Sequence, residues 1–107
     1  MINITIINGP NLNLLGKREP GVYGTASFDD CLADLIQKYP SVHFTYFQSN
    51  IEGELINAIQ SAGTSADGII LNPAGYTHTS VAIGDAITAI QTPVVEVHIS
   101  NVHARES

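Results

Sequence analysis

Apolar and polar positions follow two alternating periods along this chain. Short runs rich in β-branched residues predict strands over 2–7, 42–48, 67–72 and 94–99. Apolar residues at helical spacing predict helices over 28–39, 51–63 and 83–90. Strands and helices therefore alternate strictly from the first residues to the last predicted strand.

Local signals set the helix ends. Ser27 is followed three residues later by Asp30, which predicts an N-cap, and Pro40 ends the first helix. The apolar stripe of this helix, from Phe28 to Tyr39, is predicted to belong to the core. The segment 49–52 resembles a second capping box, and Thr92-Pro93 closes the third helix.

The alternation predicts the fold class. Without a hairpin signal between strands, the connections are right-handed crossovers and the sheet is parallel, with helices on its faces. We therefore expect one α/β domain over residues 1–107, in three layers α/β/α. Three helices are few for covering two faces, so we expect either a partner on the bare face or a sequence truncated from something longer.

Composition limits the partners. Charged residues make up 13% of the chain and the net charge is −6, which argues against a nucleic-acid interface. The first residues lack a basic leader region, and no apolar run approaches the ~18–20 residues of a membrane span. We expect a cytoplasmic protein with no membrane segment. A single cysteine, Cys31, excludes an intramolecular disulfide.

Polar residues gather where the predicted strands end. In a parallel sheet, ligands bind at the carboxyl ends of the strands. Those ends carry a set of amides, imidazoles, a carboxylate and a hydroxyl: Asn8, Asn11, Gln48, Asn72, His78, Glu96, His98 and Ser100. The sequence therefore predicts a site along this rim.

The connection over 9–25 is much longer than the ~2–6 residues such a turn needs, which is typical of a functional loop. It holds four glycines and two prolines, together with Arg18 and Tyr23. A loop of this kind at the mouth of an α/β sheet indicates an active-site lid.

Two residue pairs suit acid and base chemistry. Arg18 can favour the phenolate of Tyr23, whose use as a base near neutral pH needs a shift of roughly three pKa units, or roughly 4 kcal/mol. Glu96 and His98 are two residues apart on a strand, so they point to one face. A neighbouring carboxylate favours imidazolium, a good proton donor.

Three long motifs carry a family resemblance. Residues 7–16 with Arg18-Glu19-Pro20 and Tyr23-Gly24, then residues 72–80, then residues 96–106, closely resemble the signatures of type II 3-dehydroquinate dehydratases, in the same order. The likeness runs the whole length of the chain. Family members continue with a further strand and helix, including a substrate-binding Arg, so the resemblance implies a C-terminally incomplete domain.

The resemblance implies a flavodoxin-like fold, a homododecamer built from trimers, and neither metal nor organic cofactor. The implied activity is that of a hydro-lyase of the shikimate or quinate pathway, in aromatic amino acid biosynthesis, which removes water from 3-dehydroquinate to give 3-dehydroshikimate. Tyr23 would take the C2 proton with Arg18 as its activator, while His98, oriented by Glu96, would protonate the departing C1 hydroxyl. Asn11 would help place a water that stabilises the enolate. The residues implied to hold the substrate are Asn72, His78, Ile99, Ser100 and, from a neighbouring subunit, Asp85.

Three other hypotheses stay open. The chain could be a truncated, catalytically inactive homologue that keeps the site residues. It could be a flavodoxin-like module that binds a small anion, although Asn8 and Asn72 stand where a receiver domain needs acidic residues. A metal-dependent hydrolase would use His78, His98, His103 and Glu96, whose spacings match no familiar ligand pattern.

Overall fold

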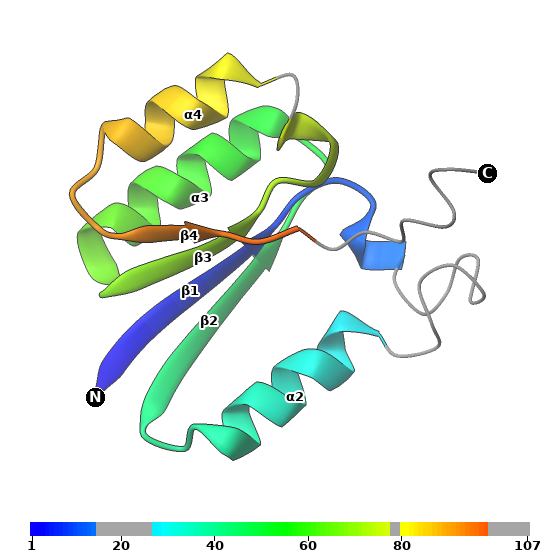
Figure 1. The fold of residues 1–107 in the computed structure, drawn as a ribbon, viewed down its shortest axis with the longest axis vertical. Helices are drawn as coiled ribbons and strands as arrows, with labels where there is room; N and C mark the ends of the chain where they lie inside the picture. The colour runs from blue at the N-terminus through cyan, green and yellow to red at the C-terminus, as the bar shows by residue number, and fades with distance from the viewer. Residues whose placement is uncertain (15–26, 78–79, 99–107) are drawn as a thin grey trace.

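The protein folds as a four-stranded parallel sheet between helices, in a computed structural model that describes residues 1–14, 27–77 and 80–98 (Figure 1). The sheet order is β2-β1-β3-β4, with β1 at Ile2–Asn8, β2 at Val42–Gln48, β3 at Gly68–Asn72 and β4 at Val94–Glu96. The helices are α2 (Phe28–Lys38), α3 (Glu52–Ser65) and α4 (Val81–Thr88), with short 3₁₀ turns η1 (Leu12–Leu14) and η2 (Ala74–Thr77). Helices α3 and α4 cover one face and α2 the other (Figure 1). The predicted α/β class with a parallel sheet is confirmed.

Most element boundaries agree with the sequence pattern, and three elements differ. Helix α4 lies at Val81–Thr88, two residues earlier at each end than the predicted 83–90. Helix α3 runs to Ser65, two residues past its predicted end. Strand β4 ends at Glu96 rather than 99, although Val97 N still donates to Leu71 O at 2.8 Å. No helix in the described ranges is long and apolar enough to cross a bilayer.

The two predicted capping boxes had different outcomes. At α2 the prediction is confirmed, because Ser27 Oγ accepts from Asp30 N while Asp30 Oδ2 accepts from Ser27 N. At α3 it is wrong. The N-cap is Ile51, which makes no side-chain cap. Ser49 N donates to Asn8 O at 3.1 Å, so this residue still belongs to the sheet edge and the helix cannot begin there.

The core lies between the sheet and the pair α3 and α4. Ile7, Ile69 and Leu71 supply the sheet side of this core. They pack against buried apolar side chains of the two helices: Leu55, Ile59, Ala62, Ile83 and Ala86. The three strand residues, Ile7, Ile69 and Leu71, come from continuous apolar runs of the sequence, as central parallel strands require.

The opposite face is more open, and here one prediction is wrong. The stripe over 28–39 is not core, since α2 contains no buried residue. Ile36 and Tyr39 are about half exposed, at 51% and 52%. The reason is the helix position: α2 packs beside the edge strand β2, with Phe28 stacked on Tyr46 at 5.0 Å between ring centroids. Val95, on the far strand β4, remains 59% exposed.

The turns that leave β1 and β3 touch backbone to backbone. Gly9 N donates to Asn72 O at 2.7 Å. A side chain at Gly9 would place its Cβ 2.7 Å from Pro73 O, closer than such contacts occur. Glycine is required here because two main chains approach, and this approach holds the two turns beside each other.

The core predicts a stability contrast. Replacing the fully buried Leu71 by Ala removes core contacts and leaves a cavity, so we expect a loss of about 2–5 kcal/mol in the free energy of unfolding. The half-exposed Ile36 replaced by Ala should cost well under half as much. Urea melts of both variants measure the difference. Equal losses would contradict the placement of the core.

The turn contact predicts opposite effects for two glycines. Gly9→Ala forces the Pro73 backbone aside and should destabilise by about 1–3 kcal/mol. Gly53, near the start of α3, has no atom within 4 Å of the added Cβ, so Gly53→Ala should be neutral or stabilise by up to about 1 kcal/mol. Thermal melts of the two variants test this. A Gly9→Ala protein as stable as the wild type would overturn the close approach.

Candidate active site

Polar side chains meet at the carboxyl ends of the strands, as predicted. Asn8, which ends the central strand β1, pairs in register with Gln48 on one side and with Asn72 on the other. On the far side of β3, the bond from Val97 N to Leu71 O brings the residues after β4 to the same level. The register of the sheet therefore collects residues from four separate parts of the sequence.

Asn72 is buried with part of its hydrogen-bonding capacity unused. Its side chain is 1% exposed, and Oδ1 accepts from Ala74 N at 3.3 Å. Its Nδ2 has no partner among the described residues. A buried amide donor without a partner costs about 1–3 kcal/mol, so this atom is suited to a polar group that enters the rim.

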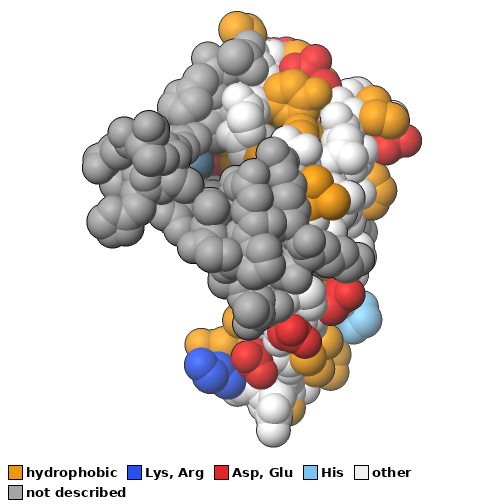
Figure 2. Space-filling view, turned by 90° about the vertical axis from the view of Figure 1, so that its right-hand side faces the viewer, with side chains coloured by type: hydrophobic (Ala, Val, Ile, Leu, Met, Phe, Trp, Pro, Cys, Tyr) orange, Lys and Arg blue, Asp and Glu red, His pale blue; other side chains and the backbone are white. Residues whose placement is uncertain are grey.

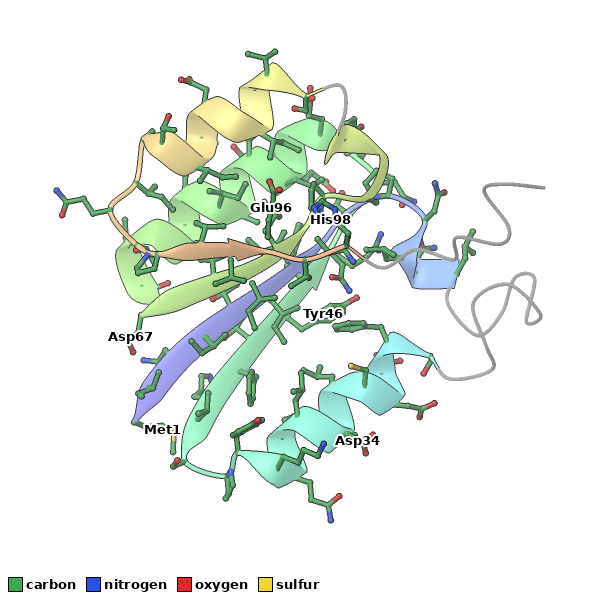
Figure 3. The ribbon with its side chains drawn as sticks, viewed as in Figure 1. Met1, Asp34, Tyr46, Asp67, Glu96 and His98 are labelled. Atoms are coloured by element: carbon green, nitrogen blue, oxygen red, sulfur yellow. The ribbon has the colours of Figure 1, made fainter. Side chains whose placement is uncertain are left out.

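Glu96 and His98 face each other at the end of β4, where Figure 3 shows them next to one another beside the sheet. Glu96 Oε2 lies 3.6 Å from His98 Nε2, and both side chains are about half exposed. At this distance the carboxylate acts on the imidazole through charge rather than through a direct hydrogen bond. The prediction that the two share a face agrees with this geometry.

Asn11 has a backbone that few residue types adopt. Its φ is +71°, in the left-handed region, which Asn tolerates better than most side chains. Its N–H donates to Asn50 Oδ1 at 2.9 Å, and η1 begins at the next residue. The turn therefore holds Asn11, with an exposed side chain, just beyond the end of β1.

Tyr46 lies on the α2 side of the rim (Figure 3). Asn8 Nδ2 donates to its hydroxyl at 3.3 Å. Burial raises the pKa of Tyr46 above its ordinary value; the carboxylate of Asp29 acts in the same direction and the bond from Asn8 opposes them.

The remaining predicted site residues divide into two groups. Asp85 is exposed on α4, away from the core side of that helix. The others lie outside the described residues: Arg18, Tyr23, His78, Ile99 and Ser100. The structure thus places Asn11, Asn72, Glu96 and His98 at one rim and Asp85 on a helix surface.

Two hollows lie near these elements. The smaller, of about 200 Å³, opens beside the start of α2 and is lined by Leu12, Asn13, Ser27, Phe28, Asp29, Tyr46 and Gln48. The larger, of about 460 Å³, lies between α3 and the strands β1 and β2 and contains none of the predicted site residues. Because the predicted site residues lie at the rim and not in the larger hollow, the rim is the candidate active site.

Charge at the surface is mostly negative or absent. Figure 2 shows acidic and apolar side chains interspersed on one face. Lys38 is the only Lys or Arg within the described ranges, at the far end of α2. In the same part of the chain, no group of three or more His, Cys, Asp or Glu side chains could hold a metal ion.

Sequence reasoning missed two contributors. Asn50 was interpreted as part of a helix cap, yet its side chain bonds the turn that carries Asn11. The sequence pattern identifies Tyr46 only as a strand residue, because its hydrogen bond to Asn8 depends on how the strands pair. The one available signal for Asn50 was its place directly after a strand end.

Comparisons with known proteins agree on one family. The family model described as Dehydroquinase class II matches residues 2–107. The chain is 58% identical to a 3-dehydroquinate dehydratase of Fusobacterium nucleatum, over 98% of the chain and 75% of that relative. Among solved structures, the type II dehydroquinase from Propionibacterium acnes aligns with a TM-score of 0.86 at 38% identity, covering 100% of this chain and 75% of that one. The type II dehydroquinase from Butyrivibrio crossotus aligns at 0.82 and 43% identity, covering 95% and 73%.

The chain therefore spans about three quarters of the length of the relatives it matches. The match covers the first strand, the rim residues and the segment that follows β4. On the family match and on the identities, this chain belongs to the class II dehydroquinase family.

Proposed function

We propose that this protein dehydrates 3-dehydroquinate to 3-dehydroshikimate as a type II hydro-lyase of the shikimate or quinate pathway. The observation that carries the proposal is the rim itself, where a buried Asn72 with an unused donor lies next to the strand that brings Glu96 and His98 together. The family match over residues 2–107 supports the same reaction.

The reaction needs a base beside the ketone and an acid for the departing hydroxyl. Tyr23, as phenolate, takes the C2 proton, and the electron pair moves onto the ketone to form an enolate. The fixed charge of Arg18 favours that phenolate. A water placed by Asn11 donates to the enolate oxygen and stabilises it.

The second step expels the C1 hydroxyl. His98, as imidazolium, gives its proton to this oxygen, so that water leaves while the enolate electrons form the C1–C2 double bond. Glu96, whose Oε2 lies 3.6 Å from Nε2 of His98, orients the ring. Solvent then returns a proton from Tyr23 to His98, and the cycle closes without a cofactor.

Substrate hydroxyls and carboxylate need several polar contacts. Asn72 donates to the substrate from Nδ2, which has no partner among the described residues. His78, Ile99 and Ser100 supply the other proposed contacts to the substrate. Asp85, exposed on α4, reaches the site of a neighbouring subunit. This role requires an oligomer, and we propose a cytoplasmic homododecamer of trimers.

Removal of the proposed base tests the reaction. Tyr23→Phe should lower kcat by about 10²–10⁴-fold, because the phenyl ring cannot accept a proton. Tyr39→Phe makes the same change at the half-exposed C-cap residue of α2 and should leave kcat unchanged. The measurement is the rise of the conjugated enone absorbance when 3-dehydroquinate is added.

The same assay separates the alternatives. No turnover by the folded, cooperatively melting wild-type chain would point to an inactive homologue and contradict the proposal. Equal loss in both Tyr variants would show damage to the fold rather than loss of a base. Binding of a small anion without turnover would favour the flavodoxin-like binding module.

Asn72→Leu tests the buried donor. The variant loses one long bond, from Ala74 N to Oδ1, but it also removes a buried donor, Nδ2, that has no partner among the described residues. The two effects oppose each other, so the free energy of unfolding should change by less than about 1 kcal/mol. The KM for 3-dehydroquinate should rise at least about tenfold, since a substrate hydrogen bond is lost. Urea melts and steady-state kinetics measure the two quantities. A normal KM would exclude Asn72 from the substrate site.

A further inference from the structure

Two amides outside the proposed catalytic set hold the turn over 9–13. Gln48 Nε2, at the end of β2, donates to Gly9 O at 3.2 Å and lies 3.4 Å from Asn13 Oδ1. Asn50 Oδ1, two residues on, accepts from Asn11 N at 2.9 Å. The turn is thus bonded at Gly9 and at Asn11 by the last residue of β2 and by Asn50 just after it, across 39 positions of sequence.

The two amides also bond each other. Gln48 Nε2 donates to Asn50 Oδ1 at 3.2 Å. The same oxygen therefore accepts from Gln48 and from Asn11, which fixes the orientation of the Asn50 amide toward the turn. Its main-chain oxygen lies 3.5 Å from Tyr76 Oη, which connects the residue to η2 as well.

The conformation of Asn11 makes this support necessary. A non-glycine residue at φ +71° is strained and keeps that backbone only where its surroundings enforce it. Two hydrogen bonds act on its main chain: Leu14 N donates to Asn11 O at 3.0 Å within the turn, and Asn11 N donates to Asn50 Oδ1 at 2.9 Å. The bond to Asn50 is the one that comes from outside the turn.

A purely structural role for Asn50 explains less. Helix α3 begins at Ile51 without a side-chain cap, so the Asn50 side chain is not used to start it. Asn50 is exposed and contributes nothing to the buried core. What its side chain contacts is the turn that carries Asn11.

We infer that Gln48 and Asn50 are positioning residues for the dehydration, which hold Asn11 in the backbone conformation that places its side chain at the reacting enolate. This inference rests on the proposed function of Asn11. It predicts that the pair acts on the rate of the chemical step more than on substrate binding, because a small misplacement of a group that acts in the transition state lowers kcat.

Matched variants test the inference by kinetics. Asn50→Ala removes the acceptor and should lower kcat about tenfold or more, with KM changed by less than about threefold. Asn50→Asp keeps an oxygen that accepts from both Asn11 N and Gln48 Nε2, and should restore kcat to within about threefold of wild type. Gln48→Glu adds the same charge but removes the donor, and should be impaired like Asn50→Ala. Gln60→Ala, an exposed amide on α3, serves as control with unchanged kinetics.

A second measurement does not depend on turnover. Hydrogen exchange at the Asn11 amide, followed by NMR, should be at least about tenfold faster in Asn50→Ala and return to the wild-type rate in Asn50→Asp. If the wild-type chain does not turn over 3-dehydroquinate, the proposed function fails, and exchange still decides whether Asn50 holds Asn11. An Asn50→Ala protein with wild-type kcat or wild-type exchange overturns the inference. So does an Asn50→Asp protein as impaired as Asn50→Ala.

Discussion

The contact on which the rim depends is the backbone bond from Gly9 to Asn72. It closes the turn after β1 onto the turn after β3 at 2.7 Å, and no side chain fits between them. This bond continues the pairing of two parallel strands one residue past the end of β1, onto the last residue of β3. Because the two main chains cannot separate, whatever the turns carry stays at one edge of the sheet.

The residues that end β1 and β3, just before these turns, carry amides rather than charges, and the reason is physical. Asn8 and Asn72 are both about 1% exposed, and a carboxylate at either position would need a paired cation that this part of the described chain does not supply. An amide can be buried at lower cost and still offer a donor. The unused Nδ2 of Asn72 shows that the fold tolerates an incomplete hydrogen-bond set where a substrate is proposed to enter.

The pair of Glu96 and His98 lies at the end of β4 and is more exposed to solvent. Glu96 and His98 are about half exposed, unlike the buried amides. Strand β4 is short and lies at the edge of the described sheet, where the chain leaves the core. The buried amide of Asn72 and the half-exposed pair of Glu96 and His98 thus belong to neighbouring strands.

Much of this could be predicted from local patterns. Runs rich in apolar and β-branched residues placed β1, β2 and β3 to within a residue, because strands with helices on both faces need apolar side chains on both faces. The spacing of Glu96 and His98 determined that they share a face, since side chains alternate along a strand. Ser27 and Asp30 determined the start of α2 through bonds that span three residues.

Other features were decided only by tertiary structure. The stripe of α2 looked like core, but a helix is buried only as far as its neighbours cover it, and α2 packs beside an edge strand. Ser49 looked like a helix cap, but pairing with Asn8 kept it in the sheet. The role of Asn50 depends on a turn 39 residues away, and no local pattern carries that information. The amino-acid sequence thus determined the elements, their order and, among the described residues, which polar side chains lie at the rim. Which of those residues touch one another was settled by strand register and by the close approach of two turns.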